Sequence, residues 1–278
     1  MNVNWTSANT PDLTGKIIIV TEGSNSIGFE AVKTFSAKGA TTIMACHDLT
    51  IGEKAKKMIL DQHPKANIEL MALDISDMKS MNLFVEAFRS KFERLDVLLH
   101  NAANVSIQTK GKDGNVSQLA HFTLTGLLLP SLTKAHNSRV VTLSEGENKI
   151  HAKDFSKLLA GTAHGNSSKA MGFKMANMLF TYELQKRFDK EGVNCIAVAA
   201  YPGTHNKNHE RKLENSLSWK LFKPFFSMFG GANASVEAIP AIRASVAKDV
   251  KGGEYYGPNG FVEVKGYPSY STLEQLVA

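Results

Sequence analysis

The chain has 278 residues, of which 43% are hydrophobic and 21% charged, and it carries a formal net charge of +6. This composition is typical of a globular protein with a sizeable core, and the lack of a Pro/Ser/Gly-rich linker favours one large α/β domain over two small ones. Lys and Arg are spread over many segments and alternate with acidic residues. We therefore do not predict nucleic-acid binding; a basic surface of this kind favours anionic small molecules.

Cysteine usage and the N-terminal sequence predict the compartment. Cys46 and Cys195 both lie within apolar, strand-like runs, which is typical of buried free thiols in a reducing environment. The first residues lack a basic segment followed by an apolar one, and no stretch approaches the roughly 18 consecutive apolar residues of a membrane span. The sequence therefore predicts a cytoplasmic protein without a membrane span.

Strand-like and helix-like segments alternate at short intervals, and the strands are nearly continuous apolar runs. This pattern predicts a doubly wound parallel sheet, a Rossmann-like α/β fold in a single domain over 1–278, preceded by a polar arm over 1–15. In chain order we expect a strand at 16–21, a helix at 26–39, a strand at 41–46, a helix at 51–63, a strand at 68–74, a helix at 77–92, a strand at 95–103, a helix at 117–134, a strand at 138–144, a helix ending near 190, a strand at 193–203, a helix at 234–247 and a short terminal strand.

The stretch IIIVTEGSNSIGFE, residues 17–30, predicts a strand, a tight turn and the start of a helix. A dinucleotide-binding turn needs glycine where the backbone takes a positive φ and comes close to a pyrophosphate. Gly23 and Gly28 are present, but Glu22 and Ser26 stand at two positions where glycine is expected. A carboxylate there would repel the phosphates, and the amides at the helix start could hold that carboxylate instead.

Several segments match one family: DLTGKIIIVT, NSIGFE, LDISDMKS, LDVLLHNAA, RVVTLS, KMANMLFTYELQKR, YPG and GGEYYGP. Over about residues 12–270 the chain resembles the short-chain dehydrogenase/reductases, in particular their retinol-dehydrogenase-like and WW-domain-oxidoreductase-like branch. The resemblance implies NAD(H) or NADP(H) as cofactor and hydride transfer to or from an alcohol or carbonyl carbon. It also implies a small lipophilic substrate or ligand, a lid-like segment over 205–232, and a homo-oligomer formed through helices 117–134 and 166–190.

The family chemistry implies a tyrosine acid/base followed four residues later by a lysine that lowers its pKa. Lys174 matches the lysine, but the residue four positions earlier is Ala170. An alternative register pairs His164 with Lys169, a spacing of five that places the two side chains about 140° apart on a helix. The first register keeps the helix continuous, so we prefer it and retain His164 as an alternative acid.

The other two proton-transfer positions also depart from the family pattern. The family's Ser-Ser pair is Ser144 followed by Glu145, and a carboxylate cannot donate a hydrogen bond to an oxyanion unless it is protonated. Ser144 remains as a candidate, but its position at the end of a strand favours a structural role. About five residues of the family pattern are missing before His121, and the family asparagine with them; Asn115 lies too early to replace it.

The resemblance implies a mixed set of cofactor positions. Asp74 and Ile75 match the pair that contacts adenine, whereas His47 replaces the arginine that reads the 2′-phosphate of NADP, and neutral imidazole beside Asp48 is a poor phosphate clamp. The threonine expected near the carboxamide falls on Lys207. No metal site is predicted, and the cofactor candidates are Gly23, Ser24, Asn25, Ile27, Gly28, His47, Asp74, Ile75, Asn101, Ala102, Lys174, Pro202 and Gly203.

Several of these residues also have a purely structural explanation. Gly28 fits close helix-to-sheet packing, Asn101 the joining of strand ends, Asp74 the capping of the next helix turn, and Lys174 a solvated helix position. The departures nevertheless fall on cofactor and proton-transfer positions, and we expect impaired cofactor binding. Two hypotheses follow: a short-chain dehydrogenase/reductase-like pseudoenzyme acting as a binding or assembly module, or an active NAD(P)H-dependent oxidoreductase of small lipophilic alcohols and carbonyls.

Overall fold

The computed structural model describes the backbone of residues 5–101, 120–144, 166–202, 234–258 and 268–272, and side chains over 5–101, 120–144, 177–202 and 234–257. Within these ranges, eight strands form one sheet in the order β3-β2-β1-β4-β5-β6-β7-β8. The strands are β1 (Ile17–Thr21), β2 (Thr41–Cys46), β3 (Asn67–Ala72), β4 (Val97–His100), β5 (Ser138–Leu143), β6 (Cys195–Ala200), β7 (Glu254–Pro258) and β8 (Pro268–Thr272).

The strand order reverses direction at β1. The chain goes from β1 outward to β2 and β3, and then returns to place β4 on the other side of β1. In open α/β sheets, ligands bind at the carboxyl ends of the strands where the order reverses. The fold therefore predicts a ligand-binding site at the carboxyl ends of β1 and β4.

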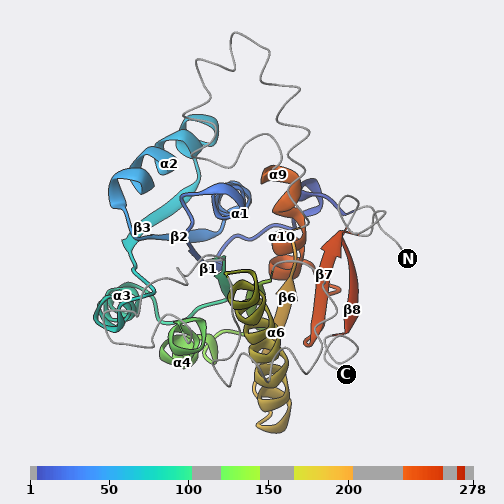
Figure 1. Cartoon of the computed structure of the whole chain (residues 1–278). Helices are drawn as coiled ribbons and strands as arrows, with labels where there is room; N and C mark the ends of the chain where they lie inside the picture. The colour runs from blue at the N-terminus through green and yellow to red at the C-terminus, as the bar shows by residue number, and fades with distance from the viewer. Residues whose placement is uncertain (1–4, 102–119, 145–165, 203–233, 259–267, 273–278) are drawn as a thin grey trace.

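Two helix layers cover the sheet (Figure 1). One layer packs α1, α2 and α10 against the sheet, with the short α9 beside α1; the other contains α3, α4 and α6. The helices are α1 (Ser26–Ala37), α2 (Leu49–Gln62), α3 (Met78–Lys91), α4 (Ala120–Leu132), α6 (Asn166–Lys190), α9 (Ala234–Glu237) and α10 (Ile239–Val246).

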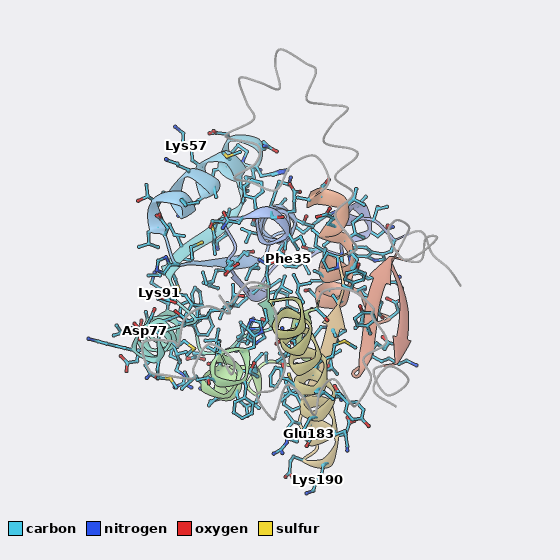
Figure 2. The ribbon with its side chains drawn as sticks, in the orientation of Figure 1. Phe35, Lys57, Asp77, Lys91, Glu183 and Lys190 are labelled. Carbon is cyan, nitrogen blue, oxygen red and sulfur yellow. The ribbon has the colours of Figure 1, made fainter. Side chains whose placement is uncertain are left out.

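The strands divide the core into two clusters because successive side chains point to opposite faces. Ile18 and Val20 enter the cluster beneath α1 and α10, whereas Ile19 enters the cluster beneath α3 and α4. Phe35 of α1 is fully buried in the first cluster, and Lys57 and Lys190 lie on the outside of the molecule (Figure 2). Burial on both faces explains why the strand sequences are continuously apolar.

The predicted doubly wound sheet is confirmed, with differences at its far edge. β8 pairs antiparallel with β7, whereas every other pairing is parallel. The helix expected over 234–247 is divided into α9 and α10, with Pro240 in the first turn of α10, where a proline needs no amide hydrogen. Strand β4 is shorter than expected, and at its start the Leu95 amide donates to Ser131 O instead of to the sheet.

The predicted arm packs on the α1–α10 side of the sheet. Trp5 and Leu13 are buried in that cluster, and the Leu13 amide donates to Lys38 O at the end of α1. The short 3-10 helix η1 (Ser7–Asn9) contacts α10. Across the described ranges, no helix combines the length and apolarity that crossing a bilayer would require.

Candidate functional site

The turn between β1 and α1 has an unusual backbone. Glu22 has φ 50° and Ser26 has φ 45°, both in the left-handed region that non-glycine residues seldom adopt. These are the two positions at which the sequence lacks the expected glycines. The turn thus keeps the conformation suited to glycine while carrying two side chains.

Gly28 and Asn101 lock this turn to the neighbouring strand. A Cβ atom on Gly28 would lie 2.5 Å from Glu22 O and 2.6 Å from Asn101 Nδ2, so only glycine fits here. Asn101 Nδ2 donates to Thr21 O at 3.1 Å and to Glu22 O at 3.3 Å, and its own amide donates to Thr21 Oγ1 at 3.0 Å. The structural explanations of both residues, close packing and the joining of strand ends, are confirmed.

The Glu22 carboxyl is the electrostatic anomaly of the turn. It is partly buried, and this burial raises its pKa. In the described part of the chain no hydrogen bond reaches this carboxyl, so the expectation that amides of the α1 start hold it is not met there. Asn25, at the N-cap of α1, provides no side-chain cap, which leaves the first amides of the helix available to an anion.

The thiol of Cys46 lies at the end of β2 beside this turn. Burial raises its pKa, hydrogen bonding with Ser24 lowers it, and the charge of Glu22 raises it further. Ser24 is itself buried. The charge of the Glu22 carboxyl therefore acts on the Cys46 thiol at the end of β2.

The predicted adenosine side of the site lies at the ends of β2 and β3. His47 Nε2 is 3.7 Å from Asp74 Oδ2, with the imidazole 78% exposed and the carboxylate 24% exposed. Asp74 Oδ1 accepts hydrogen bonds from the Ser76 amide at 2.9 Å and the Ser76 hydroxyl at 2.6 Å. Asp74 closes a local turn, whereas α3 is capped by Asp77, so the expected capping role of Asp74 is wrong.

Two neighbours of this pair have structural roles. Ile75 is 9% exposed and belongs to the core cluster beneath α3 and α4. Asp48 caps α2, accepting hydrogen bonds from the amides of Thr50 and Ile51 at 2.7 and 3.2 Å. His47 is therefore an exposed group of this corner, and its ring lies beside Asp74.

A buried histidine pair lies where β4 meets α4. The rings of His100 and His121 stack with centroids 4.4 Å apart and planes inclined at 28°. His100 Nε2 is 2.8 Å from Thr125 Oγ1, and His121 Nδ1 is 3.3 Å from Asn177 Oδ1 of α6. Burial lowers the pKa of His121 to about 4 and lowers that of His100 well below its usual value, so both rings are neutral near pH 7.

Sequence reasoning missed this pair. Each histidine stands at the boundary of an apolar segment, LDVLLH and AHFTLTGLLL, and a buried polar residue at such a boundary was the available signal. Asn177 also connects α6 to β5, because its Nδ2 donates to Leu143 O at 3.4 Å. His100 Nδ1 and His121 Nε2 have no hydrogen-bond partner among the described residues.

Ser144 follows β5 directly. Its side chain is buried, with 3% of the residue exposed, and its Oγ finds no partner within the described ranges. Its amide donates to Ala200 O at 2.8 Å, which holds the ends of β5 and β6 together. Ser144 is thus placed at the carboxyl edge of the sheet, where the sequence predicted a polar group of the site.

Of the remaining predicted site residues, the structure describes some and leaves others outside the described ranges. Lys174 belongs to α6, one helical turn before Asn177 on the same helix face, but its side chain lies outside the described side chains. Pro202 follows β6 and is half-buried, next to the buried Tyr201. Ala102, Glu145, His164, Gly203 and Lys207 lie outside the described residues, as does the lid-like segment.

The backbone of this site fits a dinucleotide, but one of its side chains does not. The left-handed backbone at 22 and 26, the close approach at Gly28 and the uncapped start of α1 suit a pyrophosphate. The ionised carboxylate of Glu22 does not suit it, because a second anion would enter a partly buried turn.

Comparison with known proteins gives the family. The sequence model described as short chain dehydrogenase matches residues 16–215. Retinol dehydrogenase 12 of Mus musculus is 32% identical over 260 residues, which cover 87% of this chain and 77% of that protein. The WW domain-containing oxidoreductase of Homo sapiens is 33% identical over 256 residues, covering 83% of this chain but 60% of that protein's length.

Solved structures agree on the fold. An uncharacterised protein from Mycobacterium Paratuberculosis superposes with a TM-score of 0.71 at 26% identity, covering 97% of this chain and 89% of that one. The RhlG/NADP active-site complex from Pseudomonas aeruginosa gives a TM-score of 0.60 at 19% identity, covering 88% and 92% of the two chains. With the family match over residues 16–215, this chain belongs to the short-chain dehydrogenases.

Proposed function

We propose that this short-chain dehydrogenase has lost or severely weakened hydride transfer and acts as a binding or assembly module, a pseudoenzyme. The observation that carries the proposal is the position of Ala170 on α6. Ala170 and Lys174 are four residues apart in one continuous helix, which is the spacing of the family's tyrosine and lysine, so the sequence has a methyl group where the family chemistry needs a phenol. A methyl group cannot transfer a proton, and loss of a general acid typically costs about 10²–10⁴ in rate.

The cofactor turn supports the same proposal. Glu22 and Ser26 occupy the left-handed positions, and the Glu22 carboxyl opposes an incoming pyrophosphate. Cofactor binding, to NAD(H) or NADP(H), is therefore impaired relative to a glycine-containing turn. In the sequence, Glu145 stands in place of the second serine of the family pair, so a carboxylate replaces the expected hydroxyl.

The ligand and assembly state form part of the proposal. We expect a small lipophilic ligand, no nucleic-acid partner, a cytoplasmic protein and a homo-oligomer formed through α4 and α6. The assembly is supported by Phe122 of α4, which is 61% exposed and contacts Phe180 of α6 edge-on with ring centroids 6.0 Å apart. An exposed phenylalanine that packs against a half-buried one on the next helix is suited to burial against a second copy.

The test combines cofactor titration with turnover. Wild type is titrated with NADPH and NADH by fluorescence, and reduction of a generic carbonyl is then followed by loss of the reduced cofactor. We expect weak binding and no measurable turnover. Micromolar binding would contradict the impaired turn, and turnover would contradict the pseudoenzyme.

A matched pair of variants tests the missing phenol. Ala170→Tyr is combined with Glu22→Gly and Ser26→Gly, and the control carries Ala170→Phe in the same background, which adds the ring without the hydroxyl. We expect the tyrosine variant to gain turnover that the phenylalanine variant lacks. If the tyrosine variant binds no cofactor, the helix register or the interpretation of the turn is wrong.

One observation favours the alternative, an active oxidoreductase of small lipophilic alcohols or carbonyls. Ser144 Oγ is buried at the end of β5 without a partner among the described residues, which suits a hydrogen bond to a substrate oxygen. In this alternative Lys174 and a replacement acid such as His164 complete the site. Turnover by wild type that is lost in Ser144→Ala would support it.

A further inference from the structure

Glu22 occupies the turn in which a dinucleotide pyrophosphate is held in doubly wound folds. It directly follows β1, four residues before the start of α1. The order of the strands reverses here, between β2 on one side and β4 on the other. Any charge on residue 22 is therefore at the centre of the ligand-binding edge.

The main chain at Glu22 is fixed on several sides. Its carbonyl accepts hydrogen bonds from Asn101 Nδ2 at 3.3 Å and from the Asn25 amide at 3.3 Å. Gly28 packs against the same carbonyl so closely that a Cβ atom would lie 2.5 Å away. These contacts hold φ at 50°, so the carboxyl cannot leave the turn by a local backbone rearrangement.

The carboxyl and a pyrophosphate compete for the same favourable field. The first amides of α1 point to this turn without a side-chain cap from Asn25, and the start of a helix favours one nearby anion. Across the described residues, no hydrogen bond or cation reaches the Glu22 carboxyl to neutralise it, and burial raises its pKa. The Glu22 carboxyl is thus protonated at a higher pH than an exposed glutamate.

We propose that Glu22 couples dinucleotide binding to proton uptake: the ionised carboxyl excludes the pyrophosphate, and NAD(H) or NADP(H) binds with the carboxyl protonated. Protonation removes the like charge, and the neutral acid can donate a hydrogen bond to a phosphate oxygen. One proton is taken up for each dinucleotide bound. This inference rests on the impaired turn of the proposed function and identifies the cause of that impairment.

Other titratable and charged groups meet at the same edge and must be separated from Glu22. They are the Cys46 thiol at the end of β2, the His47–Asp74 pair after β2 and β3, and the Glu30–Lys33 ion pair on α1, whose Oε2 and Nζ atoms are 2.6 Å apart. All of them are retained when residue 22 alone is changed. The difference between wild type and a residue-22 variant therefore isolates Glu22.

The experiment measures NADH binding by fluorescence at about pH 6.5, 7.5 and 8.5, for wild type, Glu22→Gln and the control Glu53→Gln. Glu53 is an exposed carboxylate on α2, so the control removes the same charge away from the turn. Calorimetry in two buffers with different heats of ionisation counts the protons taken up. NADH is used because it lacks the titratable 2′-phosphate of NADPH.

We expect the affinity of wild type to fall by up to about tenfold per pH unit, as binding coupled to one proton requires. Glu22→Gln should bind NADH more tightly at about pH 8.5, with a weaker pH dependence and about one proton fewer taken up. Glu53→Gln should behave as wild type. Thermal melting verifies that each variant is folded, and Glu22→Gly, which suits the left-handed backbone, is the second variant if the glutamine variant is unstable.

Two results would overturn the inference. The first is an equal pH dependence in wild type and Glu22→Gln, which would assign the proton to another group. The second is absence of NADH binding by both Glu22→Gln and Glu22→Gly, which would mean that the carboxyl is not what excludes the dinucleotide. Carbonyl turnover by wild type would instead contradict the pseudoenzyme and leave the proton coupling intact, so the two proposals fail separately.

Discussion

A carboxylate lies at the amino ends of the parallel strands, here called the amino edge, and another lies at their carboxyl ends, the carboxyl edge. The two carboxylates differ in their partners. At the amino edge, Asp96 has a side chain that is 4% exposed, and it accepts hydrogen bonds from Lys16 Nζ at 2.8 Å and from the Ile17 amide at 2.9 Å. Arg94 Nε is 3.5 Å from the same carboxylate. At the carboxyl edge, Glu22 is partly buried and has no such partner in the described part of the chain.

This difference separates stability from ligand binding. Asp96 joins the starts of β1 and β4, and the hydrogen bonds to both of its oxygens offset the cost of burying the charge. The carboxyl edge contains backbone strain at Ser26, an unsatisfied acid at Glu22 and the neutral pair of His100 and His121. Departures from local stability of this kind are typical of the places where a fold binds or once bound a ligand.

The largest effect is expected at the amino edge. Asp96→Ala leaves the Ile17 amide without its acceptor, whereas the 46% exposed Lys16 side chain can be solvated, and we expect a loss of about 3 kcal/mol in the free energy of unfolding, measured by urea denaturation. The matched control is Glu69→Gln, which breaks the exposed pair with Lys91 and should cost at most about 1 kcal/mol. Equal losses in the two variants would show that Asp96 has no special role.

The histidine pair should make the carboxyl edge sensitive to acid. In the folded protein the pKa of His121 is lowered from 6.5 to about 4, so between these values the unfolded chain binds the proton and the folded chain does not. Stability is therefore complete above about pH 6.5 and falls as the pH decreases toward 4. We expect a loss of about 2–3 kcal/mol over this window from His121, and burial of His100 acts in the same direction.

Urea denaturation at about pH 7 and pH 4.5 measures this loss. His121→Gln should show a smaller difference between the two pH values than wild type, whatever its stability at pH 7. His47→Gln is the control because the imidazole of His47 is 78% exposed, and it should keep the wild-type difference. An unchanged difference in His121→Gln would assign the acid sensitivity to other groups.

The smallest effect concerns the strained turn. Ser26→Gly places at φ 45° the residue that this conformation suits, and we expect a gain of about 1 kcal/mol in the free energy of unfolding. Asn137→Gly is the comparison, since Asn137 has φ 58° but asparagine tolerates this region better, and the gain there should be smaller. A loss of stability in Ser26→Gly would mean that contacts of the serine side chain outweigh the strain.

Much of the fold could be predicted because it depends on local patterns. Apolar runs long enough for a strand, separated by amphipathic segments, predicted the parallel strands β1 to β6 and the approximate bounds of most helices. The absence of glycine at positions 22 and 26 was also visible, and the left-handed backbone of Glu22 and Ser26 confirms that these positions need a positive φ. The pairing of β7 with β8 was not predicted, since antiparallel pairing depends on where the chain returns rather than on its periodicity.

The site was predicted less completely than the fold. The sequence pointed to Asp74 as a cap, but the cap of α3 is Asp77, because which of two nearby acids reaches a helix amide depends on a shift of a few residues. Asn101 and Gly28 were correctly recognised as positions of close contact. Lys174 and His164 stay predictions, as their side chains lie outside those described.

By itself, the sequence determined the strand–helix alternation, the family resemblance and the chemical types present at the turn and on α6, since all of these are properties of neighbouring residues. Only the tertiary structure decided which distant groups meet. His100 and His121 stack because α4 packs on β4, and the Glu22 carbonyl is held by Asn101 because β1 and β4 are adjacent. Burial and its effect on protonation arise from those contacts, and for that reason the proton-dependent features of this protein became visible only in the folded chain.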